Sequence, residues 1–309
     1  MTVDREKSSQ LGVLQRNGVV CAAFCKGPMT AFIERATQAA AAVTSSPLWS
    51  KLPCAATIGA AETRYRATTP EQFLEQIGAW IAFNEADARQ LFAFEICAGD
   101  DPFNPELGIE VIADRDAVAA GSRVRHLFEL RLPIESFAPG DAAAQVELLL
   151  HVLQILPVES AYAAPATTWT RRPSVPRPDG RHAALAFSNR AIDVHVNAAT
   201  RFEIGGHCRG AYWMVMLNEV LVGAAGGSEM LNELRTAGIA VTSVANGVML
   251  QVGESPYERA ELGRSVFARY QALARALEPI TLTDDLDLER ARFNANPDAL
   301  DRYERRFGP

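Results

Sequence analysis

The sequence has little lysine and none of the common short motifs of catalysis. Only three of its 30 basic residues are lysine, so few side chains are available for Schiff-base chemistry or for holding phosphates. It contains no G-x-x-x-x-G-K-[ST] phosphate loop, no G-x-G-x-x-G, no G-x-S-x-G elbow and no H-E-x-x-H. These absences leave no recognisable active site, and we expect no catalytic residues, no cofactor and no bound metal.

Cysteine is also scarce. The five cysteines form no C-x-x-C pair, and an odd count at irregular spacing argues against both a disulfide framework and a zinc ribbon. We therefore expect buried free thiols. The adjacent His207 and Cys208 are not expected to form a catalytic dyad, because neighbouring side chains on an extended chain point to opposite faces.

Long apolar runs are missing too. No segment approaches the roughly 20 consecutive apolar residues of a membrane-spanning helix. Residues 1–20 contain acidic side chains and lack the apolar block and small-residue cleavage site of a signal peptide. The sequence therefore predicts a protein of the cytoplasm.

Negative charge is present in excess and is concentrated in one segment. Between Ala67 and Asp116 the chain has eleven acidic residues and two arginines, so this segment has a net charge of −9. The rest of the chain has +2, which gives the total of −7. One interpretation is a solvated helix face with acidic turns. The other is a surface that attracts a basic protein and repels nucleic acid. Under the second interpretation, the candidate partner-binding residues are Glu85, Asp87, Asp100, Asp101, Glu106, Asp114 and Asp116.

Hydrophobic periodicity predicts strands mixed with helices. Strands are expected at residues 18–25, 91–97, 107–113 and 123–132, and a helix at 28–43. The run Thr69-Pro70-Glu71-Gln72 predicts a helix start with a reciprocal capping box. In the strand 123–132, apolar side chains alternate with charged ones, which predicts an antiparallel sheet with one wet face. His126 lies on the apolar face and is expected to be a hydrogen-bonded core residue.

The last third of the chain contains the clearest local signals. The run "AYWMVMLNEVLVGAAGG" predicts a helix led by Trp213 and ended by Gly226 and Gly227. Asn246-Gly247 between two apolar runs predicts a tight hairpin in which both turn residues have positive φ. Residues 266–280 predict a long helix.

The expected fold class is α/β in the α+β sense, with mixed, largely antiparallel sheets packed with helices. Residues 164–186 are rich in proline and arginine and are expected to be a linker or long loop. This divides the chain into an N-terminal lobe, 1–163, and a C-terminal lobe, 187–309. One continuous domain is the alternative.

The order of motifs in the second half of the chain resembles the type VI secretion immunity protein family. That family has a "YAG"-like strand end, a Trp-led "WLTxL" helix closed by Gly-Gly, an "IQAGxxP" strand and a Tyr-containing helix before "LxPI/LR". The matching positions here are Tyr162-Ala163, Trp213 with Leu217, Gly226-Gly227, Gln251-Val252-Gly253 with Pro256, and Tyr270 with Leu277, Pro279 and Ile280. The sequence departs from the family pattern at Ala163, Val252 and Thr281.

The resemblance implies an antidote that binds a type VI secretion effector toxin and blocks it stoichiometrically, without being an enzyme. A nuclease acting in the cytoplasm is the implied toxin, because its basic substrate site would fit an acidic inhibitor. Two other classes stay open. One is a hydrolase or transferase whose residues are scattered along the sequence, and the other is an adaptor or chaperone for a secreted effector.

Overall fold

Ten strands form a single antiparallel sheet in the computed structural model. The structure describes residues 16–50, 52–59, 65–83, 90–100, 105–138, 140–168, 197–256 and 263–282. The strand order is β3-β2-β4-β5-β6-β1-β7-β8-β10-β9, and every pair of neighbouring strands is antiparallel. The expected fold class, an α+β fold built on an antiparallel sheet, is confirmed.

The described strands and helices are interspersed along the chain. The strands are β1 (Arg16–Cys25), β2 (Cys54–Ile58), β3 (Arg66–Thr68), β4 (Leu91–Ala98), β5 (Leu107–Asp114), β6 (His126–Pro133), β7 (Val158–Thr168), β8 (Met214–Asn218), β9 (Ala240–Val244) and β10 (Gly247–Gln251). The α-helices are α2 (Met29–Thr44), α3 (Pro70–Phe83), α4 (Ala142–Ile155), α6 (Asn197–Thr200), α7 (Glu219–Ala224), α8 (Gly227–Thr236) and α9 (Arg264–Leu277). The 3-10 helices are η2 (Arg115–Val118), η3 (Ile134–Phe137) and η4 (Glu278–Ile280).

Strands from both halves of the chain belong to the same sheet. β1 pairs with β6 on one side and with β7 on the other, and β7 pairs with β8 from the second half. β7 runs through Thr168, so the first five residues of the segment expected to be a linker are part of a strand. The rest of that segment lies outside the described residues. The division into two lobes stays a prediction.

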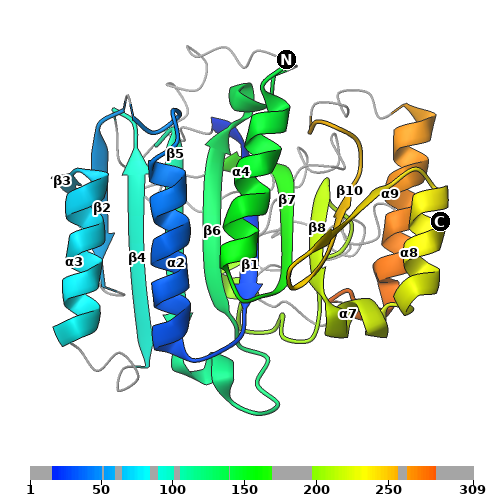
Figure 1. Ribbon diagram of the computed structural model, residues 1–309, viewed down its shortest axis with the longest axis horizontal. Helices are drawn as coiled ribbons and strands as arrows, with labels where there is room; N and C mark the ends of the chain where they lie inside the picture. The colour runs from blue at the N-terminus through cyan, green and yellow to red at the C-terminus, as the bar shows by residue number, and fades with distance from the viewer. Residues whose placement is uncertain are drawn as a thin grey trace, which may run out of the picture.

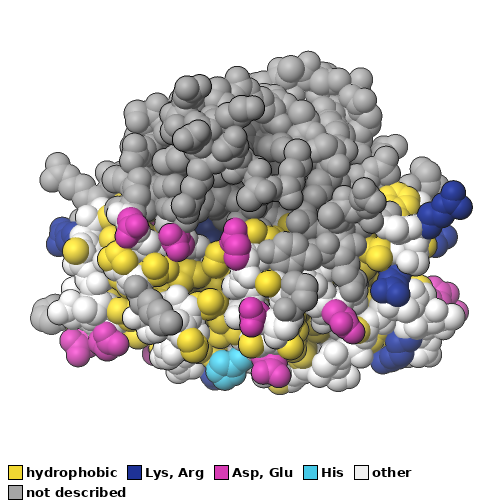
Figure 2. Space-filling view, turned by 90° about the horizontal axis from the view of Figure 1, so that it is seen from above, with side chains coloured by type: hydrophobic (Ala, Val, Ile, Leu, Met, Phe, Trp, Pro, Cys, Tyr) yellow, Lys and Arg dark blue, Asp and Glu magenta, His cyan; other side chains and the backbone are white. Residues whose placement is uncertain are grey.

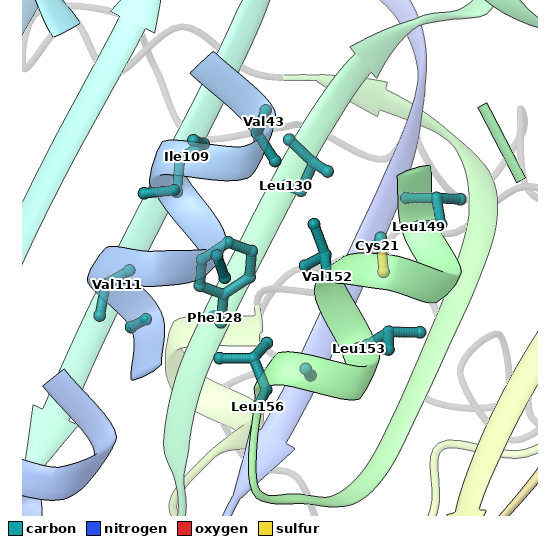
Figure 3. Packing of buried hydrophobic residues seen from close by; sticks show 14 of the residues in the cluster. Cys21, Val43, Ile109, Val111, Phe128, Leu130, Leu149, Val152, Leu153 and Leu156 are labelled. Carbon is teal, nitrogen blue, oxygen red and sulfur yellow. The ribbon is translucent and has the colours of Figure 1, made fainter. Parts of the chain in front are cut away.

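One face of the sheet, here called the helix face, is covered by α2, α3 and α4 (Figure 1). Figure 3 shows Phe128 of β6 among side chains of α2 and α4, with Ile109 and Val111 of β5 beside it. Phe128, Ile109 and Val111 are fully buried. Their regular alternation along β5 and β6 is what the sequence pattern predicted for a strand with one apolar face.

The second face carries a separate apolar cluster in the C-terminal half of the sheet. Here α8 and α9 pack against β8 and β10, through residues such as Leu234, Leu273, Val215 and Leu250. Because β1 lies at the centre of the sheet, both of its faces are buried. Cys21 belongs to the helix-face cluster, and Val20 and Ala22 belong to the cluster on the second face.

Several local predictions are confirmed. Thr69 and Gln72 form the reciprocal capping box of α3: the amide of Gln72 donates to Thr69 Oγ1, and the amide of Thr69 donates to Gln72 Oε1, each at 3.3 Å. Gln251, in β10, and Val244, in β9, lie in the hairpin expected around Asn246-Gly247. The loop of that hairpin is Ala245-Asn246, and of the two turn residues expected to have positive φ only Gly247 has it.

The prediction of a helix led by Trp213 is wrong. Trp213 directly precedes the strand β8, and the helix α7 begins only at Glu219. Asn218 caps α7 by accepting a hydrogen bond from the amide of Leu221 at 2.9 Å. The apolar run 211–224 is thus divided into a buried strand and a short helix, because a continuous apolar run carries no period that would distinguish the two.

Across the described part of the chain, every helix is too short or too polar to pass through a lipid bilayer.

Candidate functional site

Of the seven acidic residues that the sequence put forward, the structure describes four, and these four fall into two separate places. Asp100 is exposed in the turn after β4, and Glu106 is half-buried just before β5. These two residues lie at the same end of the sheet, since Ala98 pairs with Leu107. Glu85, Asp87 and Asp101 lie outside the described residues.

Asp114 and Asp116 lie at the opposite end of β5. Eight residues of strand separate the two ends by roughly 26 Å at about 3.3 Å per residue. Asp114 does not reach the surface: it is 5% exposed, forms a 2.8 Å ion pair with Arg201 and accepts a hydrogen bond from the amide of Asp116. Asp116 is exposed. Asp100 and Asp116 therefore lie at opposite ends of the sheet.

Other acidic residues join Asp100 and Glu106 at their end of the sheet. Glu135 follows β6, Asp141 precedes α4 and Glu254 follows β10, and all three are exposed. The antiparallel register brings these strand ends together, because Gly108 pairs with Arg131 and Met214 pairs with Gln251. We call this surface the acidic end; its described residues are Asp100, Glu106, Glu135, Asp141 and Glu254.

Figure 2 views the molecule from this end. Asp and Glu side chains are spread across the visible face with apolar side chains between them, whereas most of the visible Lys and Arg side chains gather on the side of α8 and α9. An apolar centre with a polar rim is the common arrangement in protein interfaces.

Residues of the family-like signature hold Glu254 in place. Trp213 Nε1 and Gln251 Nε2 both donate to the carbonyl oxygen of Gly253, at 3.3 and 2.9 Å. Gly253 has φ +80°, which glycine adopts without strain. Ser255, the residue after Glu254, donates from Oγ to the carbonyl oxygen of Phe137 in η3 at 3.3 Å. The turn that carries Glu254 is therefore fixed to the rest of the acidic end.

Trp213 also packs beneath that turn. Its ring meets the ring of Phe137 edge-on, with 5.5 Å between centroids and an interplanar angle of 90°. Both side chains are fully buried. The sequence analysis matched Trp213 to a family motif but did not indicate that it lies under the turn of Glu254. That position depends on contacts with Phe137, which is far from both residues in sequence.

A second group of charged residues lies on the second face of the sheet, across β4, β5 and β6. Arg131 donates from Nε to Glu129 at 2.7 Å and from NH2 to Glu110 at 2.9 Å, and its NH1 lies 3.4 Å from Glu95. The four side chains are between 3 and 12% exposed. Sequence analysis expected this strand face to be wet, but here the charges are buried and paired with one another.

Arg131 is the centre of this group. Burial alone would lower the pKa of its guanidinium, but the carboxylates outweigh that effect, led by Glu129 and followed by Glu95 and Glu110, and the pKa is raised. Arg131 is thus permanently charged and serves as the shared partner of three carboxylates. The arrangement is that of a structural ion-pair network, since each carboxylate already contacts a guanidinium nitrogen.

Four of the five described cysteines are buried, and the fifth, Cys54, is half-buried. Burial raises the pKa of the Cys21 and Cys97 thiols to about 12 and that of Cys208 to about 11, so these thiols are protonated at neutral pH. His207, next to Cys208, places Nδ1 3.0 Å from the carbonyl oxygen of Gly205. Among the described residues, no group of three or more His, Cys, Asp or Glu side chains is arranged to hold a metal ion.

Comparison with known proteins gives a family and a fold. The family model TsiV, described as type VI immunity for VRR-NUC, matches residues 73–307. A solved structure described as Pseudomonas aeruginosa T6SS protein PA0821 superposes with a TM-score of 0.70 and 19% sequence identity, covering 86% of this chain and 73% of that one. At this identity the likeness concerns the fold alone. No curated protein sequence matches the chain.

Proposed function

This chain belongs to the TsiV family of type VI immunity proteins for VRR-NUC effectors, and we propose that it neutralises a cognate VRR-NUC toxin by binding it, not by an enzymatic reaction. Membership of the family over residues 73–307 is the observation that carries this proposal. The proposed partner is a nuclease, as the effector's name implies, and the proposed place of action is the cytoplasm, where a nuclease toxin would meet the cell's nucleic acid.

The proposed binding surface is the acidic end. A nuclease holds a phosphate backbone and therefore has a basic substrate site. Carboxylates on an immunity protein are attracted to that site over several ångströms and can occupy the positions of the phosphates. Asp100 and Glu106 supply such carboxylates from the connection between β4 and β5, and Glu254 supplies one from the turn after β10. Asp101, which follows Asp100 in the sequence, is included in the proposal.

The construction of the acidic end supports this choice. The turn of Glu254 is tied to Trp213 and to η3, so little conformational freedom remains to be lost when a partner binds. The apolar side chains visible between the acidic ones provide surface that can be buried in a complex. A stable complex of this type usually buries roughly 1,200–2,000 Å².

The experiment is a growth rescue combined with a binding measurement. The effector encoded beside this gene is expressed in a susceptible cell with the wild-type chain or with the double variant Asp100→Lys/Glu254→Lys. We expect the wild type to restore growth and the double variant to bind the purified effector at least roughly ten-fold more weakly. Binding by the wild type should also weaken with added salt.

Asp116→Lys is the matched control, because Asp116 is an exposed acidic residue at the far end of β5. It should bind the effector like the wild type. If Asp116→Lys weakens binding and the double variant does not, the interface lies at the other end of the sheet. Inactivation of an excess of effector by substoichiometric amounts of the chain would instead show an enzyme.

A further inference from the structure

The two edges of the sheet are built differently. β3, at one edge, has only three residues and includes the charged Arg66. β9, at the other edge, has five residues, Ala240 to Val244, and contains neither a charged residue nor a proline. Short strands, edge charges and prolines are the usual means by which proteins prevent strands from adding to a sheet. β9 has none of the three.

The backbone of β9 is set up to accept another strand. The two-residue loop closes the hairpin at Val244 and Gly247, and hydrogen-bonding positions alternate from there along the ladder. This alternation directs the amide and carbonyl groups of Val241 and Ser243 away from β10. The side chains of Thr242 and Ser243 are exposed, and both are small enough to let a second strand approach.

We propose that β9 pairs antiparallel with β9 of a second copy of this chain, so that the two ten-stranded sheets become one. A two-fold axis through Thr242 places Thr242 opposite its equivalent and Val241 opposite Ser243 of the other copy. Each of the two Val241–Ser243 pairs then exchanges two backbone hydrogen bonds, giving four between the copies. Thr242 forms the close, non-hydrogen-bonded pair, in which Thr–Thr contacts are favourable.

A second copy fits this edge better than an unrelated strand for two reasons. First, the outward-pointing residues Val241 and Ser243 lie symmetrically on either side of Thr242. In an antiparallel pair of two β9 strands, the amides of one copy therefore face the carbonyls of the other. Second, the whole chain carries −7, and β9 is a neutral element at which two acidic molecules can meet without placing like charges opposite each other.

The predicted dimer is a weak one. Five paired residues on each side bury far less than the roughly 1,200–2,000 Å² of a typical stable complex, so we expect association at high micromolar concentration. Pairing about this axis reverses the direction of the strands, and it therefore points the acidic ends of the two copies in opposite directions. Each copy keeps its acidic end available for an effector. The dimer proposal can therefore be tested independently of the proposed immunity function.

Sedimentation velocity over a range from micromolar to near-millimolar protein tests the proposal. The wild type should shift from monomer to dimer across this range. Thr242→Lys places two positive charges at the two-fold axis, and it should raise the dimer dissociation constant by roughly ten-fold or more. The matched control Thr236→Lys adds the same charge at an exposed position of α8 and should dimerise like the wild type.

Ser243→Pro provides a second test. It removes an amide hydrogen that points outward, so it should abolish the dimer while the thermal midpoint stays close to that of the wild type. Thr242→Pro removes an inward amide hydrogen and should lower the midpoint clearly. A wild type that remains monomeric throughout, or a Thr242→Lys dimer of unchanged strength, overturns the proposal. The proposal is also overturned if the wild type is monomeric and Thr242→Lys no longer binds the effector, because β9 would then be part of the effector-binding surface.

Discussion

Tyr162 donates a hydrogen bond to Asn197 Oδ1 at 2.7 Å, and this bond is the first of two that together cross the strand β1. Asn197 Nδ2 in turn donates to Glu129 Oε2 at 2.9 Å. Between Glu129 on β6 and Tyr162 on β7 lies Ala22 of β1, which pairs with both. Because alanine ends at Cβ, the side chain of Asn197 has room to connect the two. The charged group around Arg131 is thereby linked to the C-terminal half of the sheet.

Asn197→Ala should destabilise the fold by about 1–3 kcal/mol, because it leaves the Tyr162 hydroxyl and a carboxylate oxygen of Glu129 without this buried partner. Urea unfolding followed by circular dichroism measures the change. Asn232→Ala, at an exposed position of α8, is the control and should stay within about 0.5 kcal/mol of the wild type. Equal stability of the two variants would show that the connection across Ala22 contributes nothing.

Arg131→Leu should lower the free energy of unfolding more than Asn197→Ala does. It leaves Glu95, Glu110 and Glu129 buried together without the guanidinium they share, and breaking a buried ion-pair network in this way costs roughly 3–5 kcal/mol. Arg115→Leu is the control, since Arg115 is exposed and its NH2 donates to Gln90 Oε1 at the surface, at 2.7 Å. A fully folded Arg131→Leu protein with an unchanged midpoint in urea would contradict this account.

Local signals in the sequence were sufficient for much of the N-terminal half. Apolar runs predicted β1, β4 and β5, alternation predicted β6, and the Thr69–Gln72 pattern predicted the start of α3. These features depend on residues within one or two turns of each other. His126 is a further example: its place on an apolar strand face predicted a buried, hydrogen-bonded histidine, and it is 0% exposed.

The apolar run after Ala211 shows where local reasoning ends. Trp213 and Met214 are buried on the sheet, and Leu221 is buried on a helix, yet the sequence between them is almost uniformly apolar. Only Asn218, which caps α7, marks the boundary. Tertiary contacts decide such a segment, because a strand buried on both faces and a buried helix have the same composition.

The candidate site depends even more on contacts between distant residues. Acidic residues close in sequence, such as Glu106 and Asp116, are carried to opposite ends of β5. Glu254, 148 positions after Glu106, comes to the same end as Glu106 because β10 runs in the required direction. Counting charge along the sequence finds an acidic segment, but only the strand order shows which of its members can touch one partner.

Gly247→Ala should destabilise the C-terminal hairpin. Gly247 has φ +152°, and a Cβ atom there would lie 2.0 Å from the carbonyl oxygen of Leu217 and 2.8 Å from the Cα of Asn218, both backbone atoms. The strain should lower stability by roughly 1–3 kcal/mol, seen as a lower thermal midpoint. Gly223→Ala is the control: nothing lies within 4 Å of its Cβ, and a helical alanine should be neutral or stabilising by about 0.5–1 kcal/mol. A midpoint for Gly247→Ala equal to that of Gly223→Ala would be evidence against the close approach.

Acid should weaken the fold through His126. Its Nδ1 accepts a hydrogen bond from the amide of Asp114 at 3.1 Å, so Nε2 carries the proton and donates to the carbonyl oxygen of Gly27 at 2.8 Å. The ring stacks on Phe32 with 4.4 Å between centroids. Burial is the main cause that lowers the pKa of His126 from its ordinary 6.5 to about 4.

The direction of the pH effect follows from that lowered pKa. Below pH 6.5 the unfolded chain takes up a proton on His126 while the folded chain does not, so the free energy of unfolding falls as the pH drops toward 4. Protonation of His126 should lower the free energy of unfolding by about 3 kcal/mol in total. His126→Gln should be less stable than the wild type at pH 7, because its packing on Phe32 is lost, but it lacks the protonation penalty. The stability difference between the two proteins, measured by urea unfolding at several pH values, should therefore narrow between pH 7 and 4. A difference that stays constant over this range would mean that His126 is protonated as readily in the folded chain as in the unfolded one.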